Sequence, residues 1–279
     1  MQILKYNDEI TNEEKELHIE DKLAYFLNKK VKGSLSKKDK DYVMLIDGYE
    51  GAGKSTFGQQ IGKWVDPSLN LSRICMTAEE FHKAINEAPK DSCVIYDEAV
   101  TGMSAGDSIA KVGKVLKALM MQMRQKNLFV IIIIPSVFEL NRYTVLSRAR
   151  SFFHVYENKG MRGFYVGYNQ RDLKNLYLKG KQFYNYKVRS YFNGRFWGKY
   201  TVNEEAYREK KNKAMQNTEK KQTALEQKHT KQRNLAFKML LDLGMTYNQI
   251  QEAFDKAGVG LAHSTLVESV VEARKMWPN

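Results

Sequence analysis

The chain has 279 residues, which is enough for one large domain or for a core domain with an appendage. Hydrophobic residues make up 43% of the sequence and the mean hydropathy is −0.55. The longest apolar run, Leu128 to Ile134, is far too short to span a bilayer, so we expect no membrane-spanning helix. The net charge of +13 favours an acidic partner, with nucleic acid ahead of a membrane surface, although a solvated basic surface is the alternative.

Cysteine usage and the N-terminus both bear on the compartment. The two cysteines, Cys75 and Cys93, fall in segments with the composition of buried strands, so we expect inert core thiols in a reducing compartment. The first residues run directly into acidic sequence and lack the apolar region of a signal peptide. These features predict a cytoplasmic protein.

Residues 1–40 are expected to form an N-terminal helix and a basic linker ahead of the main domain. The apolar positions between Glu16 and Leu27 have helical spacing. A lysine-rich stretch follows from Lys29 to Lys40, interrupted by Gly33 and two serines. This stretch is typical either of a solvated linker or of a basic arm that contacts phosphates.

A glycine-rich motif follows an apolar strand that we predict over residues 41–47. Residues 48–55 match G-x-x-x-x-G-K-[ST], the phosphate loop, and residues 56–61 open a helical pattern. The glycines let successive backbone N–H groups point at one anion, and the start of the helix adds positive potential. Lys54 can reach the outer phosphates of a nucleotide, and Ser55 can offer its hydroxyl to Mg²⁺. A glycine-rich turn at a helix start is the alternative, but the strand–loop–helix setting predicts an ATP site made by Gly48, Glu50, Gly51, Ala52, Gly53, Lys54, Ser55 and Thr56.

A third predicted strand, Ser92 to Glu98, ends in two carboxylates. It follows a second strand near Arg73 to Met76 and a helix that Thr77 can cap. In phosphate-loop enzymes such a strand carries the Asp that holds Mg²⁺, so Asp97 is predicted to be a metal ligand together with the phosphate-loop serine. Glu98 is predicted to be the general base that polarises the attacking water. The alternative is a strand that ends in acids without a catalytic role.

Two further core strands are predicted after a long helix over residues 107–126. The first, Leu128 to Ile134, is stopped by a proline, and Ser136 then stands where enzymes of this class place a residue that contacts the γ-phosphate or the attacking water. A short helix is expected from Glu139 to Arg148, ahead of the fifth strand over residues 152–156.

Arginines cluster around this short helix. Ring-shaped ATPases complete a site with an arginine of the neighbouring subunit, because phosphoryl transfer needs additional charge stabilisation. The candidates for such a finger are Arg148 first, then Arg150 and Arg142. The alternative is that these side chains solvate a helix end or pair with Glu139.

The character of the sequence changes after the fifth strand. Asn158-Lys159-Gly160 predicts a hairpin turn into a strand from Arg162 to Tyr168. Aromatic residues alternate with lysines and arginines from Tyr184 to Tyr200, which is typical either of strands that cover the core or of a stacking surface for single-stranded nucleic acid. Asn193-Gly194 predicts a second tight turn. We place the ATPase domain with this β extension at residues 41–202.

The remaining chain is predicted to be helical. Asn203 can cap a basic connecting helix or linker over residues 203–230, and the apolar spacing becomes globular again from residue 231. Residues 231–279 have the spacing of a small helix-turn-helix-like module. Its would-be recognition helix carries Glu268 and Glu272, which oppose DNA binding, so a protein-interaction module is the alternative.

Residues 41–156 resemble the additional-strand group of phosphate-loop ATPases, and within it the FtsK/HerA branch and the zonula occludens toxin-like ATPases of phages. The resemblance rests on the phosphate loop, the Asp-Glu strand end, and a long helix that ends in Arg124-Gln125-Lys126-Asn127 before a very apolar strand. Asn127 and Pro135-Ser136 depart from the group's pattern. The resemblance implies a parallel five-stranded sheet of order 5-1-4-3-2. It also implies a DNA-translocating or packaging motor, usually a homo-oligomeric ring in which an arginine reaches the neighbouring subunit's nucleotide.

The sequence therefore predicts an α/β fold, with a parallel five-stranded phosphate-loop core, a β-hairpin extension and a small C-terminal helical module. The function we favour is an Mg²⁺-dependent ATPase that binds DNA and acts as a translocation or packaging motor of a virus, plasmid or integrated element, in the host cytoplasm if viral. One alternative is an ATPase loader or regulator that binds DNA without translocating. Another is a small-molecule kinase, which would usually place the Asp-bearing strand beside the phosphate-loop strand.

Overall fold

The computed structural model describes residues 1–8, 13–97, 118–119 and 122–277. The chain forms two compact units, Met1–Met215 and Gln216–Asn279. Most of the helix predicted over residues 107–126 lies outside the described residues.

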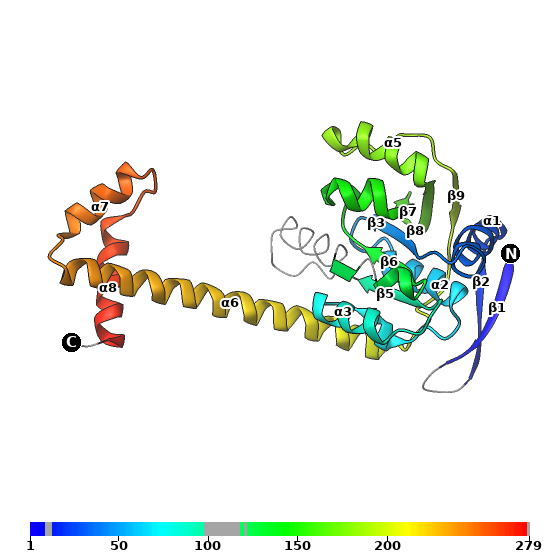
Figure 1. Ribbon diagram of the computed structural model, residues 1–279, viewed down its shortest axis with the longest axis horizontal. Coiled ribbons are helices and arrows are strands. Elements are labelled where there is room, and N and C mark those ends of the chain that lie inside the picture. The colour runs from blue at the N-terminus through cyan, green and yellow to red at the C-terminus, as the bar shows by residue number, and fades with distance from the viewer. Residues whose placement is uncertain (9–12, 98–117, 120–121, 278–279) are drawn as a thin grey trace. The chain divides into compact units, whose positions relative to one another are not determined.

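The first unit is built on a seven-stranded sheet of order β4-β5-β6-β3-β7-β8-β9 (Figure 1). The neighbouring strands from β4 to β7 run parallel, and β8 and β9 continue the sheet antiparallel. Numbered along the chain from β3, the five parallel strands have the order 5-1-4-3-2, which confirms the predicted order. The strands are β3 (Tyr42–Gly48), β4 (Ile74–Cys75), β5 (Cys93–Asp97), β6 (Phe129–Ile133), β7 (Ala149–Asn158), β8 (Met161–Asn169) and β9 (Phe192–Arg195).

Helices cover both faces of this sheet and bury its central strands. Every residue of β3, β5 and β6 is buried, as expected for parallel strands that are covered on both sides. One core contains Phe57 and Ile61 of helix α2 and the sheet residues Met44 and Ile131. The other core, on the opposite face, includes helices α3 and α5 with the alternate sheet residues. These helices span Lys54–Val65 (α2), Ala78–Glu87 (α3) and Gln170–Gly180 (α5).

The N-terminal segment differs from the predicted helix and basic linker. An antiparallel hairpin of β1 and β2 precedes α1, and α1 runs directly into a π-helical stretch. Leu17 and Ile19 are buried while His18 is exposed, so the apolar positions that fit a helix also fit the alternation of a strand. The lysine-rich stretch is helical because Val31 and Leu35, four residues apart, are buried. These elements are β1 (Gln2–Asn7), β2 (Glu14–Ile19), α1 (Asp21–Phe26) and the π-helical segment Leu27–Lys37.

The β extension confirms one predicted turn and corrects another. The hairpin between β7 and β8 turns at Lys159 and Gly160, both with positive φ. The predicted turn at Asn193-Gly194 is wrong, since both residues lie inside β9 and pair with β8. A Cβ at Gly194 would lie 2.0 Å from Glu20 Oε2 and 2.4 Å from the Tyr165 hydroxyl oxygen, so close packing requires the glycine rather than a turn.

The region between β6 and β7 also differs from the prediction. In place of one helix from Glu139 to Arg148, it forms a short 3-10 turn, Val137–Glu139, and a π-helical segment, Thr144–Arg148. Asn141 separates them and accepts hydrogen bonds at its side chain from the backbone N–H and the hydroxyl of Thr144. An asparagine that caps a new segment in this way ends the preceding one.

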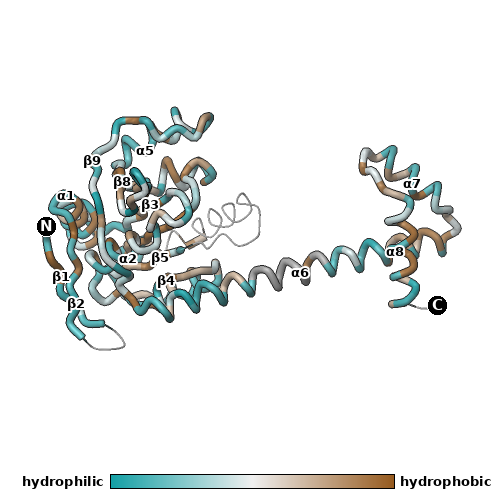
Figure 2. Tube along the Cα trace, turned by 180° about the vertical axis from the view of Figure 1, so that it is seen from behind, coloured by the Kyte–Doolittle hydropathy of each residue, from teal (hydrophilic) through white to brown (hydrophobic). Residues whose placement is uncertain are grey.

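Helix α6 begins in the first unit and ends in the second. Asn203 caps it by accepting a hydrogen bond from the Ala206 N–H at 2.8 Å, as predicted. In the second unit, Phe237 of α6 packs with Ile250 of α7 and with Leu266 and Val270 of α8. Figure 2 shows hydrophobic residues along α8 in brown. The three helices are α6 (Glu204–Asp242), α7 (Tyr247–Lys256) and α8 (His263–Met276).

Candidate active site

The phosphate loop joins the carboxyl end of β3 to the start of α2, as its motif predicts. Gly48, Gly51 and Gly53 have φ values of 143°, 78° and 98°, which side-chain-bearing residues rarely adopt. A Cβ on Gly48 would lie 1.9 Å from the carbonyl oxygen of Val155, so the first glycine is also required by the neighbouring strand β7. The loop is therefore wound tightly ahead of the helix N-terminus, where an anion is favoured.

Lys54 is the first residue of α2 and folds back over the loop. Its Nζ donates hydrogen bonds to the carbonyl oxygens of Gly48, at 2.6 Å, and Tyr49, at 2.9 Å. Burial lowers the pKa of the Lys54 ammonium; the carboxylates of Asp47 and Asp97 oppose this shift, whereas the Lys211 ammonium adds to it. The lysine thus stands at the loop with a partly desolvated charge.

Ser55 and Asp97 are brought together at the carboxyl edge of the sheet. Asp97 ends β5 and is 2% exposed. The hydroxyl of Tyr207, from α6, donates a hydrogen bond to Asp97 Oδ2 and is also hydrogen-bonded to Ser55. Burial and the Asp97 carboxylate raise the pKa of Tyr207. A serine hydroxyl beside a buried carboxylate is an all-oxygen set of the kind that Mg²⁺ prefers, so these two residues fit the predicted metal site.

Sequence reasoning missed Tyr207. The residue is 1% exposed, and its ring lies 4.8 Å from that of Tyr200. The predicted helix start at Asn203 placed Tyr207 in the first turn of α6. Since 110 residues separate Tyr207 from Asp97, no local pattern could indicate that the two side chains meet.

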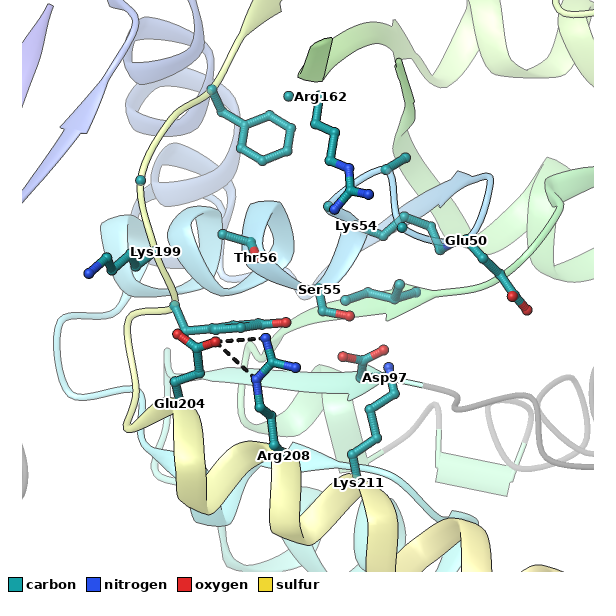
Figure 3. Close-up of a pocket in the computed structure, with 18 of the residues that line it drawn as sticks. Glu50, Lys54, Ser55, Thr56, Asp97, Arg162, Lys199, Glu204, Arg208 and Lys211 are labelled. Atoms are coloured by element: carbon teal, nitrogen blue, oxygen red, sulfur yellow. Dashed lines mark hydrogen bonds and ion pairs between the residues drawn. The ribbon is translucent and has the colours of Figure 1, made fainter. Parts of the chain in front are cut away.

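A cavity of about 770 Å³ opens over the phosphate loop (Figure 3). Residues 50–56 and Asp97 line one side of it. The other walls come from the β extension and the start of α6, with Arg162, the segment 196–200, Glu204, Arg208 and Lys211.

The segment 196–200 is fixed against α2. Gln60 Nε2 donates hydrogen bonds to the carbonyl oxygens of Trp197, at 2.7 Å, and Lys199, at 3.3 Å. The ring of Phe196 lies 4.6 Å from that of Phe57 and covers Gly53 of the phosphate loop. The aromatic stretch of the β extension thus contributes both to the core and to the wall of the cavity.

The other predicted site residues do not line this cavity or lie outside the described part of the chain. Ser136 is not among the cavity-lining residues; its hydroxyl accepts a hydrogen bond from the Phe138 N–H at 3.3 Å and lies 3.4 Å from the Tyr186 hydroxyl. Glu98, the predicted base, lies outside the described residues.

Two of the candidate finger arginines, Arg148 and Arg150, lie near the opposite end of the sheet. Arg148 forms an ion pair with Asp41, the residue that precedes β3, whereas the phosphate loop follows β3. A strand of this length separates its two ends by about 20 Å. Arg150 donates a hydrogen bond to Gln170 Oε1 at 3.3 Å, and Arg142 is exposed.

A buried polar cluster adjoins the phosphate loop, and sequence reasoning missed it. Asp47, the residue before Gly48, is fully buried, and its Oδ1 lies 2.7 Å from His154 Nδ1. Its Oδ2 accepts hydrogen bonds from the Val137 N–H and the Tyr186 hydroxyl, both at 2.7 Å. The cluster ties the entry of the loop to the segment after β6, to β7 and to the β extension. In the sequence, Asp47 only ended an apolar run.

No protein-family model matches the chain, and no curated protein matches it. Among solved structures, the chain is similar to the N-terminal domain of zonular occludens toxin from Neisseria meningitidis, with 15% identity and a TM-score of 0.33, over 60% of this chain and 97% of that chain.

Proposed function

We propose that the protein binds ATP with Mg²⁺ at the phosphate loop and hydrolyses it. The observation that carries this proposal is the convergence of Lys54, Ser55 and the buried Asp97 at the mouth of one cavity. The strand order supports hydrolysis over small-molecule phosphorylation, because β6 lies between the phosphate-loop strand and the Asp-bearing strand. A kinase would usually place those two strands side by side.

Each residue has a chemical role in this proposal. The backbone N–H groups of the loop and the Lys54 ammonium bind the phosphates. Ser55 and Asp97 would hold Mg²⁺, which neutralises phosphate charge. Glu98 follows Asp97 directly and is proposed as the base that takes a proton from the attacking water. Ser136 is proposed to contact the γ-phosphate or the attacking water, and this contact requires the segment after β6 to rearrange when the nucleotide binds.

We further propose that the ATPase acts on DNA as a translocation or packaging motor of a virus, plasmid or integrated element, assembled as a ring in the cytoplasm. The net charge of +13 supports an acidic partner. Glu272, one of the acids that oppose DNA binding, accepts a hydrogen bond from Asn234 Nδ2 at 2.7 Å and is thereby engaged within its own unit. In this proposal, residues 41–202 together with the first turns of α6 hydrolyse ATP, the rest of the segment up to residue 230 connects the two units, and residues 231–279 contact DNA. No helix among the described residues is long and apolar enough to cross a membrane.

The first experiment measures ATP binding and turnover with and without single- and double-stranded DNA. Lys54→Ala should abolish tight ATP binding, because the phosphates lose their nearest cation, whereas Lys83→Ala on α3 should bind as the parent does. Glu98→Gln should bind ATP without turning it over, since the amide cannot accept the proton. Unchanged affinity of Lys54→Ala in a titration would contradict the ATP site. DNA-stimulated turnover without translocation would favour the loader over the motor.

A further inference from the structure

The start of α6 is anchored to the edge of the sheet by two side chains. Tyr207 is buried with its hydroxyl on Asp97 Oδ2. Lys210 donates hydrogen bonds to the carbonyl oxygens of Leu71, at 3.2 Å, and Ile74, at 2.7 Å, and pairs with Glu80 at 3.4 Å. Both anchors lie within the first compact unit, which extends to Met215. The first turns of α6 are therefore part of the ATPase core.

This anchoring directs one face of α6 into the cavity. Glu204, Arg208 and Lys211 are spaced four and three residues apart, so they share a helix face, and all three line the cavity above the phosphate loop. Figure 3 shows the Arg208 guanidinium and the Lys211 amine extending from α6 toward the side of the cavity that holds Ser55 and Asp97.

The two cations differ in their present partners. Arg208 Nε and one Nη donate hydrogen bonds to the same oxygen, Glu204 Oε1, at 2.9 and 2.7 Å. Within the described part of the chain, no carboxylate lies at ion-pair distance from Lys211. With Lys54 on the facing wall, the cavity holds positive charge on both sides. A multiply charged anion placed between them would satisfy these groups, and the outer phosphates of a nucleotide at the loop would lie there.

We propose that Arg208 and Lys211 bind the outer phosphates of the nucleotide held by their own chain, and that Arg208 supplies in cis the charge stabilisation for phosphoryl transfer. This inference rests on the proposed ATPase function. Glu204 is the partner of Arg208 before the nucleotide binds, and its hydrogen bonds are exchanged for bonds to phosphate oxygens. Tyr207 is a positioning residue that sets the register of this face. The arginines near β7 then have no role in the site, and Arg148 stays with Asp41.

The first test uses single substitutions on one helix. Arg208→Ala should lower kcat by a factor on the order of 10³, as expected for loss of a charge-stabilising arginine. Lys211→Ala should weaken ATP binding by about 10-fold or more and ADP binding much less, because ADP lacks the outermost phosphate. Lys213→Ala is the matched control, since Lys213 lies on the same helix, is 75% exposed and does not line the cavity. Parental turnover by Arg208→Ala, or equal losses of ATP and ADP affinity in Lys211→Ala, would overturn the proposal.

The second test separates action in cis from action across an interface. Lys54→Ala and Arg208→Ala subunits are each inactive by this reasoning, and mixing them creates no site with both residues if both act on the same chain's nucleotide. The mixture should stay inactive, and restored ATPase activity would overturn the assignment in cis. Failure of this inference is distinguishable from failure of the proposed function. If the parent hydrolyses ATP and Lys54→Ala does not, the function stands whatever the Arg208 variants do; if the parent neither binds nor hydrolyses ATP, both fall.

Discussion

The hydrogen bond between Tyr207 and Asp97 gives a direct prediction about stability. Tyr207→Phe removes a single oxygen atom and leaves the ring packed at 4.8 Å from Tyr200. Asp97, which is 2% exposed, then lacks the donor that the phenol supplied to Oδ2. The substitution therefore isolates one polar contact, with little loss of apolar packing.

The size of the effect follows from the charge and burial of the acceptor. A hydrogen bond to a charged group contributes about 1.5–3 kcal/mol to the free energy of unfolding. For a unit of 150–250 residues, each 1 kcal/mol shifts Tm by about 2–4 °C. We expect Tyr207→Phe to lower Tm by roughly 3–12 °C.

Thermal unfolding followed by circular dichroism, at neutral pH and without nucleotide, measures this shift. Tyr184→Phe is the matched control, because Tyr184 is 57% exposed and its variant should unfold within about 2 °C of the parent. If both variants keep the parental Tm, the phenol does not stabilise Asp97, and the anchoring of α6 through Tyr207 has no energetic basis.

Three further predictions concern other parts of the chain. Gly194→Ala should destabilise the first unit by about 1–3 kcal/mol in urea unfolding, because the new Cβ would meet Glu20 and Tyr165, whereas Gly260→Ala meets nothing within 4 Å and should be nearly neutral. Burial would raise the pKa of Asp66, but hydrogen bonds from Ser68 and Cys93 and the Arg73 charge lower it on balance. The stability from this pair is therefore full above the carboxyl's ordinary pKa of about 3.9 and is lost as the pH falls through the lower folded value. In Asp66→Asn, about 3–5 kcal/mol should be missing at pH 7, because Arg73 stays buried without its partner, and a parental unfolding curve would disprove the pair's role. The affinity for DNA should fall steeply as the salt concentration rises, and deletion of residues 231–279 should reduce it. An affinity that does not depend on salt concentration would argue against phosphate contacts.

Local patterns in the sequence were sufficient to predict the phosphate loop and Asp97, which lie at the centre of the candidate site. The phosphate loop and Asp97 each lie at the end of a continuous apolar strand, and parallel strands bring their carboxyl ends to one edge of the sheet. The strand order followed from the family resemblance rather than from the residues themselves. The observed order of the five parallel strands agrees with that implication.

The predictions were wrong where one local sequence fits two kinds of secondary structure and tertiary packing selects between them. Leu17 and Ile19 fit a helix and a strand equally well, and only the pairing of β2 with β1 selects the strand. Gly194 follows an asparagine and so resembles a turn, but Glu20 and Tyr165 require a glycine there. Tyr207 and Arg208 belong to a polar helix whose register against the phosphate loop is set by contacts far apart in the chain. Such contacts leave no periodic signal in the sequence.

The pairing of early with late segments determines when this protein can fold during its synthesis. Glu20 accepts hydrogen bonds from the Tyr165 hydroxyl and from the Arg195 N–H, 145 and 175 residues later. The ring of Phe26 lies 5.5 Å from that of Phe192, which the ribosome adds only near the end of the first unit. Contacts between residues so far apart in the sequence slow folding, and apolar surface stays exposed in the nascent chain until these contacts form. The N-terminal elements must therefore wait for β8 and β9 to emerge, and the carboxyl edge of the sheet is completed last, when Tyr207 reaches Asp97.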